Sequence, residues 1–442
     1  MELNEKLGAA IRIPTFWQAD LGETEAALLD FQAFLVEKFP AFNAAAERWT
    51  PSPYSVVYRL PGEVDASAGA GEAALFLAHY DVVPAEAENW AGDPFGGETR
   101  DGFVHGRGAL DMKGILVCLL EAAERLCAAG RKPRRDLWFA IGGDEERSGV
   151  LGALEAAKWF EARGQRFSWI LDEGTPIAEN QIKGVGRPVA LVSIEEKGYL
   201  SLELAVEQEP GHASRPPRTQ AAAVLGRALC RIAKKPFPFR LGSTVEAFFR
   251  RISPLVSGAQ AFAMRRARAL GPLFFKAAAG NPSIESMLRT TVAMTMLEGS
   301  AADNVLPSRA KAVINLRLLH PWTAEKAIEF VRNAIADERV RISVYGIASD
   351  PVAPGADCMS LGWPDVSAAL EKAWPGVPAL PFIMIATTDS RHYQKLSGSI
   401  LRFTPFKIDP KELSGIHGHD ERVSIENLER GLAFYSHLLE AL

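Results

Sequence analysis

The chain has 442 residues, of which 48% are hydrophobic and 23% are charged. This composition is typical of a folded protein, and the length predicts two domains or one large domain with an insertion. Lysines and arginines number 49 against 54 aspartates and glutamates, which gives a net charge of −5. Because binding to a phosphate backbone needs a basic excess, we expect no nucleic-acid partner.

The N-terminal residues also bear on where the protein works. They are charged and lack the apolar segment of a secretory signal. No uninterrupted apolar run approaches the roughly 20 residues that a helix needs to span a bilayer. We therefore expect a cytoplasmic protein without a membrane partner.

The first half of the chain alternates predicted strands and helices. Residues 74–80, 136–143 and 167–172 form near-continuous apolar runs, as strands buried on both faces do. Apolar residues at helical spacing lie between these runs, at 114–126 and 149–160. This order predicts an α/β fold in which helices cover a mostly parallel sheet.

The hydrophobic pattern changes near residue 199. Residues 199–207 alternate between apolar and polar, as in a strand with one solvent-exposed face. The elements predicted after it are a helix at 221–233, strands at 290–297 and 310–319, a helix at 323–335 and a strand at 340–345. Their order predicts a small α+β sandwich that forms a lid domain.

Two further features complete the predicted organisation. Residues 237–287 are rich in Phe and Arg and have helical periods, so we expect extra helices there. A strand at 380–386 and a helix at 424–442 then resume the first pattern. We therefore expect one domain made of residues 1–193 and 350–442, with the lid inserted as residues 194–349.

Acidic and imidazole side chains gather where the predicted strands end, which is where open α/β sheets bind ligands. They are His79 and Asp81, Asp111 in a glycine-rich turn, Glu145 and Glu146, and Asp172. Imidazole and carboxylate groups suit Zn²⁺, and a set of this size is typical of two-metal sites. Each carboxylate taken alone could equally be a helix cap or a solvated charge.

Two of these positions predict more specific roles. Asp81 can accept a hydrogen bond from the second ring nitrogen of His79 and so fix its tautomer. Of the adjacent Glu145 and Glu146, one can bind a metal while the other takes a proton from a water molecule.

Several motifs together carry a resemblance to a known family. The motifs HYDVVP (79–84), GRGALDMKG (106–114) and DEE (144–146) resemble those of the M20 metallopeptidases, the peptidase T/carboxypeptidase G2/ArgE-DapE group. Later motifs are most similar to the carboxypeptidase S and N-acyl-amino-acid hydrolase branch; they lie at 171–174, 193–198, 211–214, 304–307, 388–391 and 416–421.

The resemblance implies two divalent metal ions, Zn²⁺ in the first place, with Mn²⁺ and Co²⁺ as alternatives. It gives one ion to His79 and Asp172, the other to Glu146 and His417, and makes Asp111 the bridge. His417, and not the nearby His419, matches the family pattern. Glu145 becomes the general base and acid, and the Asp111–Met112 peptide bond is expected to be cis.

The resemblance also assigns roles in the lid and the substrate site. His212 would stabilise the oxyanion, and in dimeric relatives this histidine reaches the active site of the other subunit. We therefore expect a possible homodimer through the lid, with His212 acting either in cis or across it. The residues expected to bind substrate are Asn304, Arg317, Thr388 and Arg391. The two arginines could hold a carboxylate or serve as structural ion-pair partners.

The function expected from these observations is hydrolysis of the amide bond next to a free α-carboxylate, in N-acyl-amino acids or short peptides. Two alternatives remain open. A catalytically silent family member could act as a binding or interaction protein. A serine hydrolase could use Ser214 or Ser390, although no G-x-S-x-G motif surrounds either residue.

Overall fold

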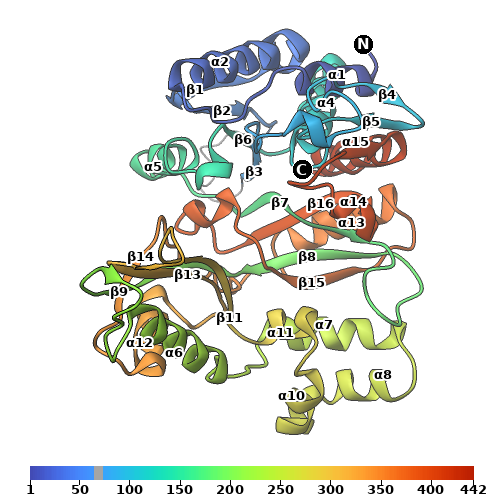
Figure 1. The fold of residues 1–442 in the computed structure, drawn as a ribbon. Coiled ribbons are helices and arrows are strands. Elements are labelled where there is room, and N and C mark those ends of the chain that lie inside the picture. The colour runs from blue at the N-terminus through green and yellow to red at the C-terminus, as the bar shows by residue number, and fades with distance from the viewer. Residues whose placement is uncertain (64–72) are drawn as a thin grey trace.

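The computed structural model describes residues 1–63 and 73–442 and contains a large and a small α/β unit (Figure 1). The large unit is built on an eight-stranded sheet. Its strands, in spatial order, are β1 (Glu47–Ser52), β2 (Ser55–Leu60), β6 (Leu137–Gly142), β3 (Ala74–His79), β7 (Trp169–Ala178), β16 (Ile400–Ile408), β8 (Val189–Glu196) and β15 (Ala379–Met384).

The centre of this sheet is parallel, since β6, β3, β7 and β16 run in one direction. β1 and β2 are antiparallel at one edge, and β8 is antiparallel to β7 but parallel to β15. The sheet is therefore mixed, and the expected α/β class is confirmed.

Helices cover both faces of the large sheet. One face packs against α1 (Leu3–Ile11), α2 (Leu21–Lys38), α3 (Pro40–Ala45), α4 (Lys113–Ala128), α13 (Trp363–Ala373) and α15 (Ile425–Ala441). The other face packs against α5 (Ala153–Ala162). Phe76 of β3 joins the first core, whereas Leu75 and Leu77 join the second. Because β3 is buried on both faces, its sequence is one continuous apolar run.

The small unit contains a four-stranded sheet whose order is β11 (Thr291–Glu298), β13 (Arg309–Leu318), β9 (Gly198–Glu207) and β14 (Arg341–Val344). Helices α6 (Ala221–Lys234) and α12 (Ala324–Ile335) pack on one face through the even-numbered apolar residues of β9 and β13, such as Leu202 and Ile314. The α+β lid expected from the sequence is confirmed.

Five helices lie in residues 237–287 and just beyond: α7 (Ser243–Ile252), α8 (Gly258–Arg265), α9 (Ala267–Leu270), α10 (Pro272–Ala278) and α11 (Pro282–Leu288). We call residues 237–287 the helical insert. Its core includes Leu191 of β8 and Leu380 of β15, and the Phe248 and Phe382 rings are 5.3 Å apart. The insert therefore packs on the last strands of the large sheet, whereas its place in the sequence predicts that it belongs to the lid. The expected domain bounds stay a prediction.

Short elements complete the chain. They are β4 (Thr99–Arg100), β5 (Phe103–His105), β10 (Gly211–His212), β12 (Val305–Leu306), α14 (Pro410–Leu413) and β17 (Arg422–Ser424). Within the described residues, none of the helices combines the length and the hydropathy needed to cross a membrane.

Candidate metal centre and active site

Six side chains from five segments meet at one edge of the large sheet. They are His79 at the end of β3, Asp111 before α4, Glu145 and Glu146 after β6, Glu173 in β7, and His417 between α14 and β17. They form two groups, each with three atoms that could bind a metal and that lie within 4.8 Å of one another: His79, Glu145 and Glu173, and then Asp111, Glu146 and His417.

Asp111 lies between two histidines. Its Oδ1 atom is 3.1 Å from Nε2 of His79, and its Oδ2 atom is 3.2 Å from Nε2 of His417. Each histidine has a second carboxylate, since Glu173 Oε1 is 3.2 Å from His79 and Glu146 Oε1 is 3.1 Å from His417. A carboxylate with one oxygen toward each group is the arrangement that a bridging metal ligand needs.

The pKa values of the two histidines indicate how strongly this site attracts positive charge. Burial lowers the pKa of His79, but the charge of Glu173 and hydrogen bonds with Asp111 and Asp81 outweigh it and raise this pKa well above its usual value. Hydrogen bonds with Asp111 and Glu146 raise the pKa of His417 to about 10. Divalent cations can satisfy the same carboxylates in place of these protons, so the donor set fits two metal ions.

Asp172 lies outside both ligand groups. Its Oδ2 atom accepts a hydrogen bond from the backbone N–H of Ser390 at 2.8 Å, and its Oδ1 atom accepts one from that of Glu173 at 2.9 Å. Glu173 thus occupies the place beside His79 that the resemblance gave to Asp172. Both residues belong to the same LDEG segment, and neighbouring side chains of a strand point to opposite faces, so only one of the two lies beside His79.

Two buried carboxylates hold the ligand loops in place. Asp81 accepts hydrogen bonds from the backbone N–H groups of Glu145 and Glu146, both at 3.1 Å. Its Oδ1 atom also lies 3.3 Å from Nδ1 of His79. Asp81 therefore orients the imidazole of His79 and the loop with Glu145 and Glu146 at once.

Glu421 is the second of these carboxylates, and its role was not predicted from the sequence. It accepts hydrogen bonds from the backbone N–H groups of Gly108, Leu110 and Asp111 and pairs with Arg107 at 2.6 Å. The Asp111–Met112 peptide bond in this turn is cis, as the resemblance implies. Arg107 also donates to the carbonyl of Gly418 at 2.7 Å, so the turn with Asp111 is tied to the loop with His417.

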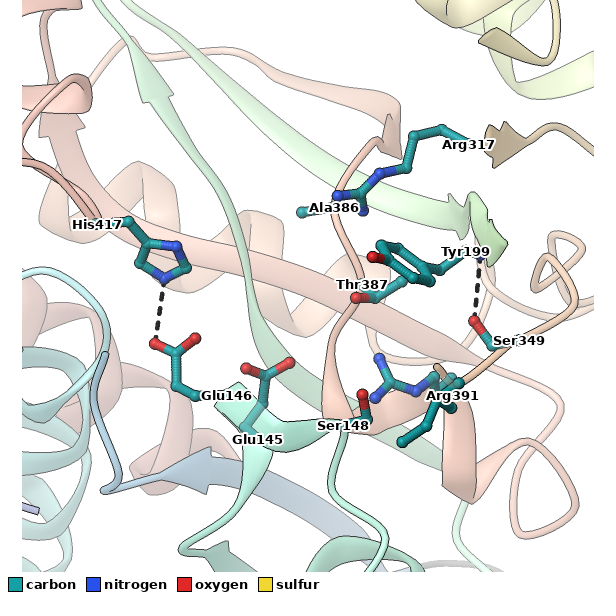
Figure 2. Close-up of a pocket in the computed structure, with 11 residues that line it drawn as sticks. Glu145, Glu146, Ser148, Tyr199, Arg317, Ser349, Ala386, Thr387, Arg391 and His417 are labelled. Carbon is teal, nitrogen blue, oxygen red and sulfur yellow. Dashed lines mark hydrogen bonds and ion pairs between the residues drawn. The ribbon is translucent and has the colours of Figure 1, made fainter. Parts of the chain in front are cut away.

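Glu145 faces a cavity of about 270 Å³ beside the metal groups (Figure 2). Burial raises the pKa of its carboxyl group well above the usual value. A carboxylate that both takes and returns a proton near neutral pH needs such a shift. The cavity walls come from both units and include Glu146, Ser148, Tyr199, Arg317, Ile347, Ser349, Ala386, Thr387, Arg391 and His417.

Two arginines contribute positive charge to this cavity, and the structure gives neither of them an ion pair within the described residues. Arg317 lies with its guanidinium carbon 4.8 Å from the ring centroid of Tyr199, and its Nε donates to Oδ1 of Asn315 at 3.3 Å. Arg391 comes from the short helix Asp389–Tyr393. In Figure 2, both guanidinium groups lie on the same side of Glu145, away from His417.

Three residues expected to act on substrate lie elsewhere. Thr388 is fully buried and donates from its hydroxyl group to Glu196 at 3.0 Å, so its neighbour Thr387 lines the cavity instead. His212 and Asn304 are exposed and adjacent, since the N–H of Ala213 donates to the carbonyl of Asn304 at 3.0 Å. Neither residue is among those that line the cavity.

A second, smaller cavity of about 200 Å³ shares Glu146 with the first. Its walls are mainly apolar and consist of Trp17, Val82, Val83, Pro84 and Arg147. The indole N–H of Trp17 donates to the carbonyl of Gly143 at 3.1 Å, which fixes the ring. The guanidinium carbon of Arg147 lies 5.0 Å from the centroid of the same ring.

Comparisons with known proteins identify the family of the chain. Residues 75–441 match the family model described as peptidase family M20/M25/M40. The chain is 33% identical to the N-fatty-acyl-amino acid synthase/hydrolase PM20D1 of Xenopus tropicalis, over 99% of this chain and 85% of the relative. It is also 33% identical to the probable carboxypeptidase S-like 2 of Dictyostelium discoideum, over 100% of this chain and 85% of the relative.

Solved structures share the fold at low sequence identity. The M20 family metallo-carboxypeptidase Sso-CP2 from Sulfolobus solfataricus superimposes with a TM-score of 0.75 at 16% identity, over 100% of this chain and 99% of that one. The expected resemblance is confirmed by the family match and by these relatives. The chain belongs to the M20/M25/M40 family of peptidases.

Proposed function

We propose that this protein is a two-metal hydrolase that cleaves the amide bond between an acyl group and an amino acid with a free α-carboxylate. The observation that carries the proposal is the cavity in which Arg317 and Arg391 lie opposite Glu145 and Glu146. A guanidinium group matches a carboxylate through two parallel hydrogen bonds. The free carboxylate of the substrate would thus be bound at one end of the cavity and its amide bond placed beside Glu145.

His79 and Glu173 would hold one metal ion, Glu146 and His417 the other, and Asp111 would bridge them. Zn²⁺ suits these nitrogen and oxygen donors best, with Mn²⁺ and Co²⁺ as alternatives. When bound, the ions supply Lewis-acid chemistry, which polarises a carbonyl group and lowers the pKa of a water molecule to about 7.

The chain's own residues would move the proton. Glu145 takes it from the attacking water and returns it to the leaving amine, for which its raised pKa is suited. Asp81 keeps Glu145 in position through the backbone hydrogen bond between them. The two arginines prevent the substrate from rotating away from this group.

The second cavity supports an orientation for the substrate. Glu146 lines both cavities, so a substrate that crosses the metal centre has its carboxylate near Arg317 and its acyl group near Trp17. The apolar walls of Trp17, Val82 and Val83 favour a hydrocarbon acyl group over a polar one. The relatives named for N-fatty-acyl-amino acids agree with this preference.

A homodimer through the lid is part of the proposal. The edge strand β11 leaves Met294, Met296 and Leu297 exposed by 48%, 42% and 71%, and only its other side is paired, with β13. An unpaired apolar edge of this kind favours pairing with a second chain. His212 lies outside its own cavity, which favours its use in the cavity of the partner.

The test is hydrolysis of a panel of N-acyl-amino acids and dipeptides by the metal-reconstituted chain. We expect turnover that a chelator abolishes and that added Zn²⁺ restores. Each substrate is paired with its α-carboxamide analogue, which should be a poor substrate. Equal hydrolysis of acid and amide contradicts carboxylate recognition, and absence of turnover with two bound metals favours a silent binding protein.

A further inference from the structure

The helical insert differs in charge from the rest of the molecule. Residues 237–287 contain six arginines and one lysine but only two glutamates, whereas the whole chain has a net charge of −5. Nothing in the proposed reaction accounts for this excess, because the insert contributes no residue that lines the cavity with Glu145. The excess therefore needs another explanation.

The outer helices of the insert combine these cations with exposed apolar side chains. Phe262 of α8 is 58% exposed, and Leu273 of α10 is 66% exposed. Arg265 and Arg266 follow Phe262 by about one helical turn, and the guanidinium carbon of Arg266 lies 6.0 Å from the phenyl centroid. Lys276 follows Leu273 in the same way.

These cations are available to a partner. In the described chain, Arg265, Arg266 and Lys276 are exposed and have no carboxylate at ion-pair distance, whereas Arg268 pairs with Glu246. Figure 1 shows α8 and α10 on the far side of α7 from the large sheet. The inward residues of both helices, such as Ala261 and Phe274, are held in the core of the insert. The exposed groups are thus carried on a folded support.

We propose that α8 and α10 form a docking surface for a membrane that contains anionic lipids. Phe262 and Leu273 would enter the boundary between headgroups and acyl chains, while Arg265, Arg266 and Lys276 bind the lipid phosphates. Isolated apolar side chains flanked by free cations favour such a surface over a protein partner, which would need a larger continuous apolar patch. This lipid contact is peripheral, and it departs from the expectation of no membrane partner.

The experiment is sedimentation of the 442-residue chain with phosphatidylcholine vesicles, with and without phosphatidylserine. We expect binding that needs phosphatidylserine and decreases as the salt concentration increases. The double variant Arg265→Glu/Arg266→Glu should lower vesicle binding by at least about tenfold. The double variant Phe262→Ser/Leu273→Ser should lower it by a similar factor without changing the charge.

Matched controls separate the surface from general effects. Arg227→Glu/Arg332→Glu changes the net charge equally on exposed lid helices, and Leu21→Ser/Leu29→Ser removes equally exposed leucines from α2. Both control variants should bind vesicles normally, and all variants should hydrolyse a short-chain soluble substrate normally. Equal binding to neutral vesicles, equal losses in the controls, or binding to duplex DNA without binding to vesicles would each overturn the proposal. The lipid and salt dependence of the unmodified chain tests it even where a variant does not fold.

Discussion

The roles of Glu145 and Glu146 differ although the two residues are adjacent. Glu146 faces His417 at 3.1 Å, whereas the carboxylate of Glu145 faces the cavity (Figure 2). Glu145→Gln should therefore keep both metals and lower kcat by at least about 10³, because it removes a proton acceptor and no ligand. Metal analysis and steady-state kinetics check this expectation. Glu146→Gln is the control and should lose metal; loss of metal from Glu145→Gln instead would reverse the two assignments.

Metal binding by variants can also decide whether Asp172 or Glu173 is a metal ligand. Glu173→Gln should weaken one metal, because its oxygen lies 3.2 Å from Nε2 of His79. Asp172→Asn should keep two metals and lower the thermal stability, because an amide nitrogen would face a backbone N–H group of Ser390 or Glu173. Titration with a chelator and thermal unfolding measure the two effects. If Asp172→Asn loses a metal and Glu173→Gln does not, the assignment from geometry is wrong.

Trp17 offers a test of substrate orientation. Trp17→Ala removes the main wall of the second cavity, so kcat/KM should decrease by about tenfold or more for substrates with long acyl chains. The acetyl group of an N-acetyl substrate is too short to contact Trp17, so kcat/KM for this substrate should change little. The measurement is the ratio of kcat/KM for the long-chain substrate to kcat/KM for the N-acetyl substrate, in the unmodified chain and in Trp17→Ala. Trp49→Ala, which changes an indole on the opposite face of the sheet from α4, serves as the control. An equal loss on both substrates would place the acyl group elsewhere.

Among the structural elements, the turn with Asp111 and the loop with His417 depend on one another through Glu421. Glu421→Gln removes the charge that pairs with Arg107 and weakens three backbone hydrogen bonds. Metal affinity should fall by about 10- to 100-fold although Glu421 binds no metal. Competition with a chelator measures this change. Glu440→Gln, which removes an exposed partner of Arg131, should have no effect; equal affinities for all three chains would contradict a positioning role.

Elements with a clear hydrophobic period were predictable from the sequence, and contacts between distant elements were not. β3, β6, α4 and α15 follow directly from apolar runs and helical spacing. The position of β16 between β7 and β8 depends on pairing across more than 200 residues, which no local pattern contains. The insert was expected on the lid because its segment lies in the lid sequence, yet Phe248 packs on Phe382 of β15. Thr387 and Glu173 were not predicted for a different reason. Each differs from its predicted neighbour, Thr388 or Asp172, in the direction in which its side chain points.

At the scale of the whole molecule, the proposed dimer predicts that two inactive chains can complement one another. His212→Ala and Glu145→Gln should each lack activity alone. In a mixed dimer, one active site would have both an intact Glu145 and an intact His212 from the partner. Random exchange of subunits should then restore about a quarter of the unmodified activity. Activity of the mixture and its mass in solution are measured together; a dimer that regains no activity would place His212 in its own subunit's site.

The tie between Glu421 and the turn at 107–111 also has a consequence during synthesis. The turn, β3 and the Glu145 loop are synthesised before His417 and Glu421, which follow about 270 residues after Glu146. Until the segment with His417 and Glu421 has emerged from the ribosome, the earlier carboxylates lack both the imidazole of His417 and the anchor of the turn. The proposed metal centre therefore closes only after this segment has been synthesised.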